Sequence, residues 1–86
     1  MKRFRFQILF YLRKNRKPKS GEYPIYLRVT ISGEQSTIST GRSIKSRFWN
    51  PKIGRVRASF DGFDQINNHL KSLQTQVYEQ FTNIEK

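Results

Sequence analysis

The sequence predicts an α+β domain in which a three-stranded antiparallel β-sheet is covered on one face by one long C-terminal α-helix, in the order β-β-β-α. Two observations support this prediction. Within residues 4–40, apolar and polar side chains alternate with a period of two, which is typical of half-buried strands. From about residue 62 the apolar spacing changes to three and four, which indicates an amphipathic helix. With 86 residues in all, residues 1–86 are expected to form one small domain.

The first strand is predicted over residues 4–12. One face consists of Phe4, Phe6, Ile8, Phe10 and Leu12, and the other of Arg5, Gln7, Leu9, Tyr11 and Arg13. Aromatic and branched side chains of this kind suit a pleated surface. The segment that follows, residues 13–22, is rich in basic residues and contains Pro18 and Gly21. It is therefore expected to be a loop, and its cations are expected to bind phosphate groups.

The second strand, Pro24 to Ser32, has the most regular alternation in the chain. Its inward residues are Ile25, Leu27, Val29 and Ile31, and its outward residues are Tyr26, Arg28, Thr30 and Ser32. A tight turn containing Gly33 then leads to a third strand at residues 35–40. In this strand Ile38 is expected to face inward, with Gln35, Thr37 and Ser39 facing outward. Gly41 is expected to end it.

Residues 41–60 are predicted to form a basic connector, anchored by Ile44, Phe48, Trp49 and Val56. The helix is predicted over about residues 62–84, with Asp61 as a candidate N-cap. Its apolar stripe consists of Phe63, Ile66, Leu70, Leu73, Val77, Phe81 and Ile84. A coiled-coil seam is the alternative, but the stripe is short and lacks flanking charges, so packing against the sheet is favoured. Such a helix is longer than strands of seven or eight residues, so we expect it to overhang the sheet and another domain to follow.

The charge of the chain is strongly one-sided. The net charge is +11, and residues 1–60 alone hold 15 basic and 2 acidic side chains, a net charge of +13, whereas residues 61–86 have a net charge of −2. A field of this kind attracts polyanions, so nucleic acid is favoured as a partner over a membrane surface or a role in solubility alone. No apolar run approaches the ~18 residues of a membrane span, and the first apolar run lacks a cleavage-site pattern, so neither a membrane partner nor a signal peptide is expected. The absence of cysteine excludes disulfides and thiolate metal sites and is compatible with a cytoplasmic location.

The outward face of the predicted sheet is the candidate DNA-binding surface. β-Ribbons can present Arg, Gln and Thr to base edges in the major groove while neighbouring basic residues hold phosphates. The residues predicted to lie on this face and contact DNA are Arg13, Tyr26, Arg28, Thr30, Thr37 and Ser39. The residues predicted to hold phosphates are Lys14, Arg16, Lys17, Lys19, Arg42 and Lys45. The loop of residues 13–19, together with Arg42, Lys45 and Arg47, is expected to frame the face.

Catalysis is not indicated. The one histidine, His69, falls on the predicted helix, and the basic half has no carboxylate pair, phosphate-binding glycine loop or metal-ligand cluster. No catalytic residue, cofactor or metal is therefore predicted. Two other functions remain open. Tyr11 and Tyr26 could stack on unpaired bases, as in modules that bind single-stranded RNA or DNA. The basic face could instead bind an acidic protein.

Several short motifs occur in the order found in a known family. They are Ile8 to Lys14, Gly21 to Thr30, Ser39-Thr40-Gly41, Trp49-Asn50-Pro51, Gly54-Arg55-Val56 and Ile66 to Leu70. On these motifs, residues 4–84 resemble the N-terminal arm-type DNA-binding domain of tyrosine recombinases, the integrases of phages and conjugative transposons. The resemblance implies a non-catalytic domain that binds double-stranded DNA at arm sites during integration and recombination of a mobile element. It also implies structural roles for Gly41 and Trp49, a longer parent chain with core-binding and catalytic domains, and a bacterial cytoplasmic location.

Overall fold

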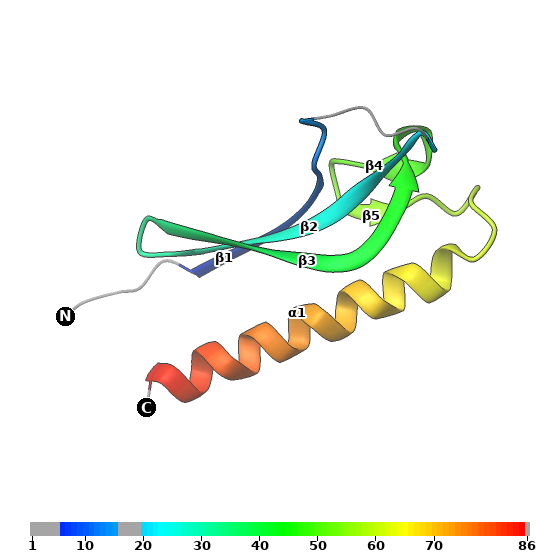
Figure 1. Ribbon diagram of the computed structural model, residues 1–86. Helices are drawn as coiled ribbons and strands as arrows, with labels where there is room; N and C mark the ends of the chain where they lie inside the picture. Colours follow the sequence, from blue (N-terminus) through cyan, green and yellow to red (C-terminus); the bar gives the residue numbers. More distant parts are fainter. Residues whose placement is uncertain (1–5, 16–19, 86) are drawn as a thin grey trace.

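The computed structural model describes residues 6–15 and 20–85, with side chains described as far as Gln80. Figure 1 shows two layers, a β-sheet and the long helix α1 (Phe63–Glu85) that runs along one of its faces. The sheet contains β1 (Phe6–Leu12), β2 (Glu22–Ile31) and β3 (Glu34–Lys45), in the order β1-β2-β3 with antiparallel pairing. The predicted α+β fold is confirmed. Phe4 and Arg5, which were assigned to the first strand, lie outside the described residues.

β2 is the central strand, and its register fixes which residues share a face. Leu27 pairs with Phe10 of β1 and with Ile38 of β3, and these three therefore point to the same side. The β2–β3 turn consists of Ser32 and Gly33, whose φ angles are 51° and 89°. Two consecutive residues with positive φ give the turn a twist that matches the strands on either side. The predicted turn and the predicted inward and outward sets of β2 are confirmed, except that Ser32 lies in the turn and not in the strand.

β3 is twice as long as predicted, because Gly41 does not end it. Pro24 pairs with Ser43 and Tyr26 with Ser39, so residues 40–42 together lie opposite Ile25 alone. The Thr40 hydroxyl occupies this bulge, donating to the Ile25 carbonyl (2.8 Å) and accepting from the Arg42 N–H (3.2 Å). Gly41 has φ +77°, which a glycine adopts without strain. The glycine therefore bends the strand, which then continues to Lys45.

The predicted basic connector is also more ordered than expected. After β3 it forms a 3₁₀ turn (Ser46–Phe48) and a two-stranded hairpin of β4 (Trp49–Asn50) and β5 (Arg55–Val56). The side chain of Asn67 on α1 acts as a further strand partner for β5. Its Nδ2 donates to the Val56 carbonyl (3.1 Å), and its Oδ1 accepts from the Val56 N–H (2.9 Å). One helical amide thus fixes the hairpin to the helix.

The core lies between the sheet, the hairpin and the first half of α1. Its buried members are Phe10, Leu12, Ile25, Leu27, Val29, Ile44, Trp49, Val56 and Leu70, with Ile66, Leu73 and Val77 packed against them. Ile38 faces this side as predicted, yet it is 43% exposed. β3 is an edge strand, and α1 packs mainly on β5 and contacts β3 less, so Ile38 lacks the cover that was expected.

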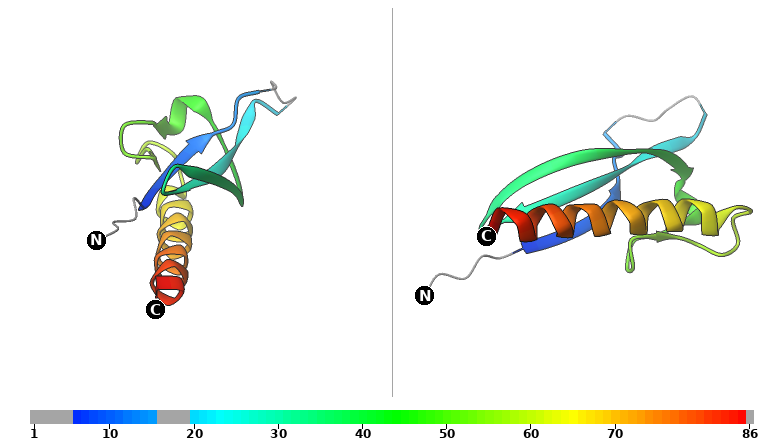
Figure 2. Two further views of the ribbon diagram at one scale, coloured as in Figure 1. Left: turned by 90° about the vertical axis from the view of Figure 1, so that its left-hand side faces the viewer. Right: turned by 90° about the horizontal axis from the view of Figure 1, so that it is seen from below.

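The two ends of α1 differ from the prediction. Gly62 precedes the helix and its carbonyl accepts from the Gln65 N–H (3.1 Å), so Asp61 lies one position too early to be the N-cap. The helix does not overhang β3, because twelve residues of strand span ~40 Å and 23 residues of helix span ~34 Å. Figures 1 and 2 show that its C-terminal end lies level with the β2–β3 turn. The side chains of Phe81 and Ile84 lie outside the described residues.

Replacing Asn67 with alanine is expected to lower the free energy of unfolding by about 2 kcal/mol, because the N–H and carbonyl of buried Val56 both lose their partner. Urea denaturation measures this change. The matched control is Asn68→Ala, at the exposed neighbouring position, which is expected to change stability by less than about 0.5 kcal/mol. Equal losses in the two variants would contradict the proposed tie between helix and hairpin.

Candidate nucleic-acid interface

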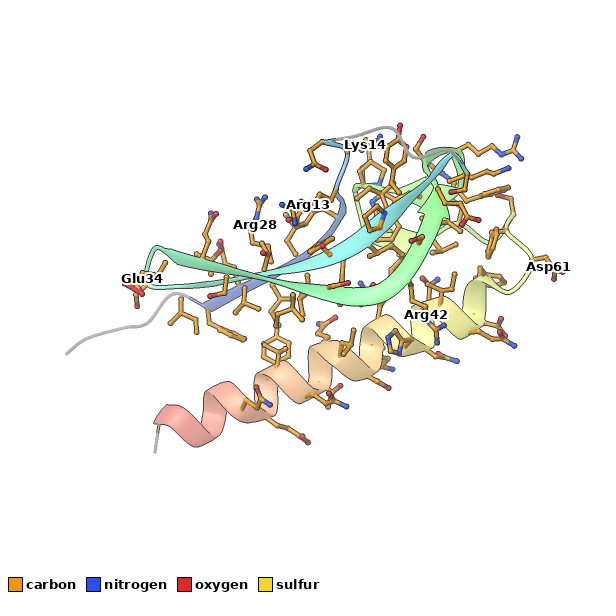
Figure 3. All side chains as sticks on the ribbon, viewed as in Figure 1. Arg13, Lys14, Arg28, Glu34, Arg42 and Asp61 are labelled. Carbon is orange, nitrogen blue, oxygen red and sulfur yellow. The ribbon has the colours of Figure 1, made fainter. Side chains whose placement is uncertain are left out.

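The face of the sheet opposite α1 is an ordered grid of nine side chains, which we call the outward face. The pairing arranges them in three rows across the strands: Tyr11, Tyr26 and Ser39; Leu9, Arg28 and Thr37; and Gln7, Thr30 and Gln35. None of the nine is acidic. The predicted outward positions Tyr26, Arg28, Thr30, Thr37 and Ser39 are thus all brought together. Figure 3 shows Arg28 projecting from this face, away from the helix, together with Arg13.

Two arginines on this face are held by tyrosine rings. The guanidinium carbon of Arg28 lies 4.7 Å from the centre of the Tyr11 ring, and that of Arg13 lies 4.9 Å from the centre of the Tyr26 ring. The two rings are 6.3 Å apart. Attraction between a guanidinium and an aromatic face limits the rotamers of both cations while their N–H donors stay exposed. The result is a continuous cluster, Arg13, Tyr26, Tyr11 and Arg28, across β1 and β2.

The backbone positions this cluster. Tyr11 and Tyr26 are direct cross-strand partners, which places their rings side by side. The Arg13 N–H donates to the Pro24 carbonyl (3.0 Å), so the pairing with β2 continues one residue beyond the end of β1. Pro24 has no N–H of its own, but its carbonyl still serves the ladder. Arg13 is therefore held against the sheet, although the sequence places it at the start of a loop.

A groove runs along the free edge of β1, next to the outward face. It is lined by Leu9 and Tyr11 of that face, by Lys14, and by Ser46, Trp49, Pro51 and Arg57 from the segment around the small hairpin. Lys14 and Arg57 bring two cations to its walls. Sequence reasoning missed Arg57, because nothing in residues 41–60 indicated which of their basic side chains would approach β1. The only available signal was the abundance of Lys and Arg in that segment.

The predicted phosphate-binding residues do not all lie beside this face. Lys14 does, since it lines the groove next to that face, and its Nζ lies 5.6 Å from the centre of the ring of Tyr23, a residue that packs against the core. Lys45 is exposed at the end of β3, opposite Glu22 of β2. Arg42 is exposed on the helix side of the sheet (Figure 3), so the prediction that it frames the outward face is wrong. Arg16, Lys17 and Lys19 lie outside the described residues.

Arg47 and His69 have local contacts. The guanidinium of Arg47 lies over the ring of its neighbour Phe48, at 4.8 Å. His69 Nε2 lies 2.9 Å from the Thr40 carbonyl at the β3 bulge, so this histidine links helix and sheet. Within residues 6–15 and 20–85, no three His, Asp or Glu side chains are grouped so that they could hold a metal ion. No helix in that part of the chain is long and apolar enough to cross a membrane.

Comparison with known protein families shows which family the chain belongs to. The family model of the arm DNA-binding domain matches residues 10–86, which is most of the chain. The chain belongs to the arm DNA-binding domain family. No curated protein and no solved structure matches it. Arm domains of this kind are non-catalytic and bind DNA, and the resemblance inferred from the sequence motifs is confirmed.

The matched region of the arm domain includes the whole cation–aromatic cluster. It begins at Phe10, so it contains Tyr11, Arg13, Tyr26 and Arg28, and it continues through the hairpin and the helix. Leu9 lies one residue before it. The cation–aromatic cluster and most of the outward face therefore fall within the matched region, whereas Gln7 and Leu9 lie before it.

The contact between Arg28 and Tyr11 is expected to contribute about 0.5–1 kcal/mol of coupling free energy. A double-mutant cycle of Arg28→Ala and Tyr11→Leu, followed by urea denaturation, measures it, since leucine keeps the apolar bulk and removes the ring. The control cycle pairs Tyr11→Leu with Lys71→Ala, at an exposed position on α1, where no coupling is expected. A coupling no larger than in the control would contradict the proposed interaction.

Proposed function

We propose that this arm domain binds double-stranded DNA by inserting the outward face of its sheet into the major groove. The observation that supports this most directly is the cluster in which Tyr11 and Tyr26 hold the guanidiniums of Arg28 and Arg13 away from the helix. Cations that are ordered before binding lose less conformational entropy when they bind. Arginine is also the side chain that most often contacts guanine in the major groove, through its O6 and N7 atoms.

The remaining polar groups of the face suit the same groove. Thr30, Thr37 and Ser39 supply hydroxyls, and Gln7 and Gln35 supply amides, in rows beside Arg28. In the proposed complex, Lys14, Arg57 and Lys45 hold phosphates at the margins, together with the predicted Arg16, Lys17 and Lys19. Phosphate contacts of this kind fix the register and orientation of a protein on the duplex, while the face contacts the bases.

The DNA is proposed to be an arm-type site of a site-specific tyrosine recombinase. In this proposal the chain is the N-terminal part of a longer integrase from a mobile element. Its core-binding and catalytic domains follow, and it acts in the bacterial cytoplasm. Membership of the arm DNA-binding family supports this proposal. The arm domain then contributes binding to DNA integration and recombination, while bond breakage belongs to the rest of the parent protein.

A single-stranded RNA or DNA ligand is the alternative, because tyrosines on an open sheet can stack on bases. The geometry favours duplex DNA instead. Each of the two tyrosine rings already has a guanidinium over one face, and both rings are partly buried, so less ring surface is left for a base. No contact in the described part of the chain favours the other alternative, an acidic protein partner.

Arg28→Ala is expected to weaken binding to a specific duplex by about 10- to 100-fold, because one good arginine–guanine contact contributes about 1–3 kcal/mol. The specific duplex is one that the wild-type domain selects from a randomised library, and a scrambled duplex measures non-specific binding. On the scrambled duplex the loss is expected to be about threefold or less. Fluorescence anisotropy at one fixed salt concentration measures both affinities.

Arg42→Ala is the control for this comparison, because it also removes one arginine, here an exposed one on the helix side of the sheet. It is expected to leave the preference for the selected duplex unchanged. If Arg28→Ala reduced binding to both duplexes equally, contact of Arg28 with a base would be excluded. A preference for single-stranded over duplex DNA, lost in Tyr26→Ala, would favour the alternative ligand.

The salt dependence of binding is expected to follow from about five phosphate contacts. For that number, the logarithm of the binding constant falls with the logarithm of salt concentration with a slope near −4.5. Lys14→Gln removes one contact and is expected to reduce the slope to about −3.6. Lys71→Gln makes the same charge change on the exposed face of α1 and is expected to leave the slope unaltered. If both variants changed the slope equally, a phosphate contact of Lys14 would be excluded.

A further inference from the structure

Leu9 is an apolar side chain in a polar setting. It is 46% exposed, and it is the one large aliphatic residue among the nine side chains of the outward face. Its neighbours on β1 on the same side are Gln7 and Tyr11, and its partners across the sheet are Arg28 and Thr37. The outward side of an antiparallel sheet usually carries polar residues. The position of Leu9 therefore requires an explanation.

The side chain best placed to cover Leu9 does not cover it. Arg28 is its direct cross-strand partner, and the aliphatic stem of an arginine can shield a neighbouring apolar group. The Arg28 guanidinium, however, lies 4.7 Å from the ring centre of Tyr11, the next outward residue along β1. The cation is thus directed towards the Tyr11 row, and Leu9 is left 46% exposed beside it. An ordered arginine and an exposed leucine lie next to each other on the same surface.

This pair matches the chemistry of two adjacent bases. The Cβ atoms of side chains directly opposite each other in antiparallel strands are about 5 Å apart, which lies between one and two of the ~3.4 Å steps between stacked base pairs, so the two side chains can reach neighbouring bases. In the major groove, guanine presents two acceptors to an arginine, and thymine presents an apolar 5-methyl group. We propose that Leu9 is a specificity-determining residue that contacts the 5-methyl group of a thymine, in the base step next to the base contacted by Arg28. This inference rests on the proposed binding of duplex DNA through the outward face.

Two other aliphatic side chains are exposed, but their positions differ from that of Leu9. Ile38 is 43% exposed but lies on the helix side of β3, and Ile53 is 64% exposed in the β4–β5 turn. Neither belongs to the outward face. Leu9 alone among these three lies beside the cation–aromatic cluster, so it is the one that a base in the groove would meet. Ile38, of nearly equal exposure, provides a matched control.

The test replaces thymine with deoxyuridine, which removes only the 5-methyl group and keeps base pairing. A duplex that the wild-type domain selects from a randomised library is synthesised with one thymine at a time replaced, and anisotropy gives each affinity. We expect one position at which the replacement weakens binding about fourfold, as for the loss of one buried methyl. Leu9→Ala is expected to weaken binding to the thymine duplex and to bind both duplexes equally. Ile38→Ala is expected to keep the wild-type discrimination.

The outcomes separate the inference from the proposed function. If the wild-type domain selects a duplex sequence yet tolerates deoxyuridine at every position, or if its site lacks thymine, Leu9 does not contact a thymine methyl and duplex binding still stands. If Leu9→Ala keeps the discrimination, another residue makes the contact. If no sequence is enriched and no duplex binds, the proposed function fails and the inference with it. The wild-type measurement requires no variant, so it holds even if Leu9→Ala is unstable.

Discussion

The pairing of β2 with a strand on each side is the constraint on which the rest of the domain depends. A central strand with strict alternation must place Ile25, Leu27 and Val29 on one side and Tyr26, Arg28 and Thr30 on the other. A register slip of one residue on an edge strand would turn its outward residues towards the core, which are Gln7, Leu9 and Tyr11 in β1 and Gln35, Thr37 and Ser39 in β3. The apolar side is covered by α1 and the small hairpin, and the opposite side is left free of other elements. The same strand pairing therefore determines both the core and the exposure of the outward face.

An uncovered sheet face in a small domain needs its own source of order. Here the long cations are not left to solvent, since tyrosine rings on adjacent strands hold both Arg13 and Arg28. The same two rings lie 6.3 Å apart and are partly buried. Each contact contributes only a fraction of the domain's stability. In the proposed complex its larger effect is to restrict the arginines before DNA binds, which lowers the conformational entropy lost on binding.

The sequence predicted what alternation alone determines, namely the three strands, the helix and the side of the sheet on which each residue lies. It did not predict contacts that depend on register, such as Tyr11 beside Tyr26. Periodicity shows which face a residue lies on, but it does not show which residue of the next strand is its partner across a long loop. Gly41 misled for a physical reason: a glycine with positive φ can end a strand or form a bulge. The long-range bond from Thr40 to the Ile25 carbonyl decides between the two. The bulge adds two residues, so the alternation of β3 remains in phase and Arg42 falls on the helix side with Ile44.

The distribution of charge follows the layers of the fold and, in the proposed complex, orients the domain on DNA. Residues 1–60, a range that includes the sheet and hairpin, have a net charge of +13, whereas residues 61–86, a range that includes the helix, have −2. Asp64 and Glu79 are exposed on α1, on the opposite side of the sheet from Arg28. At physiological ionic strength the Debye length is about 8 Å, less than the 21 Å of the shortest dimension of the molecule. DNA at the outward face is therefore screened from the helical carboxylates, whereas DNA approaching the helix meets them directly. The long-range field thus favours the approach that brings the outward face to the groove first.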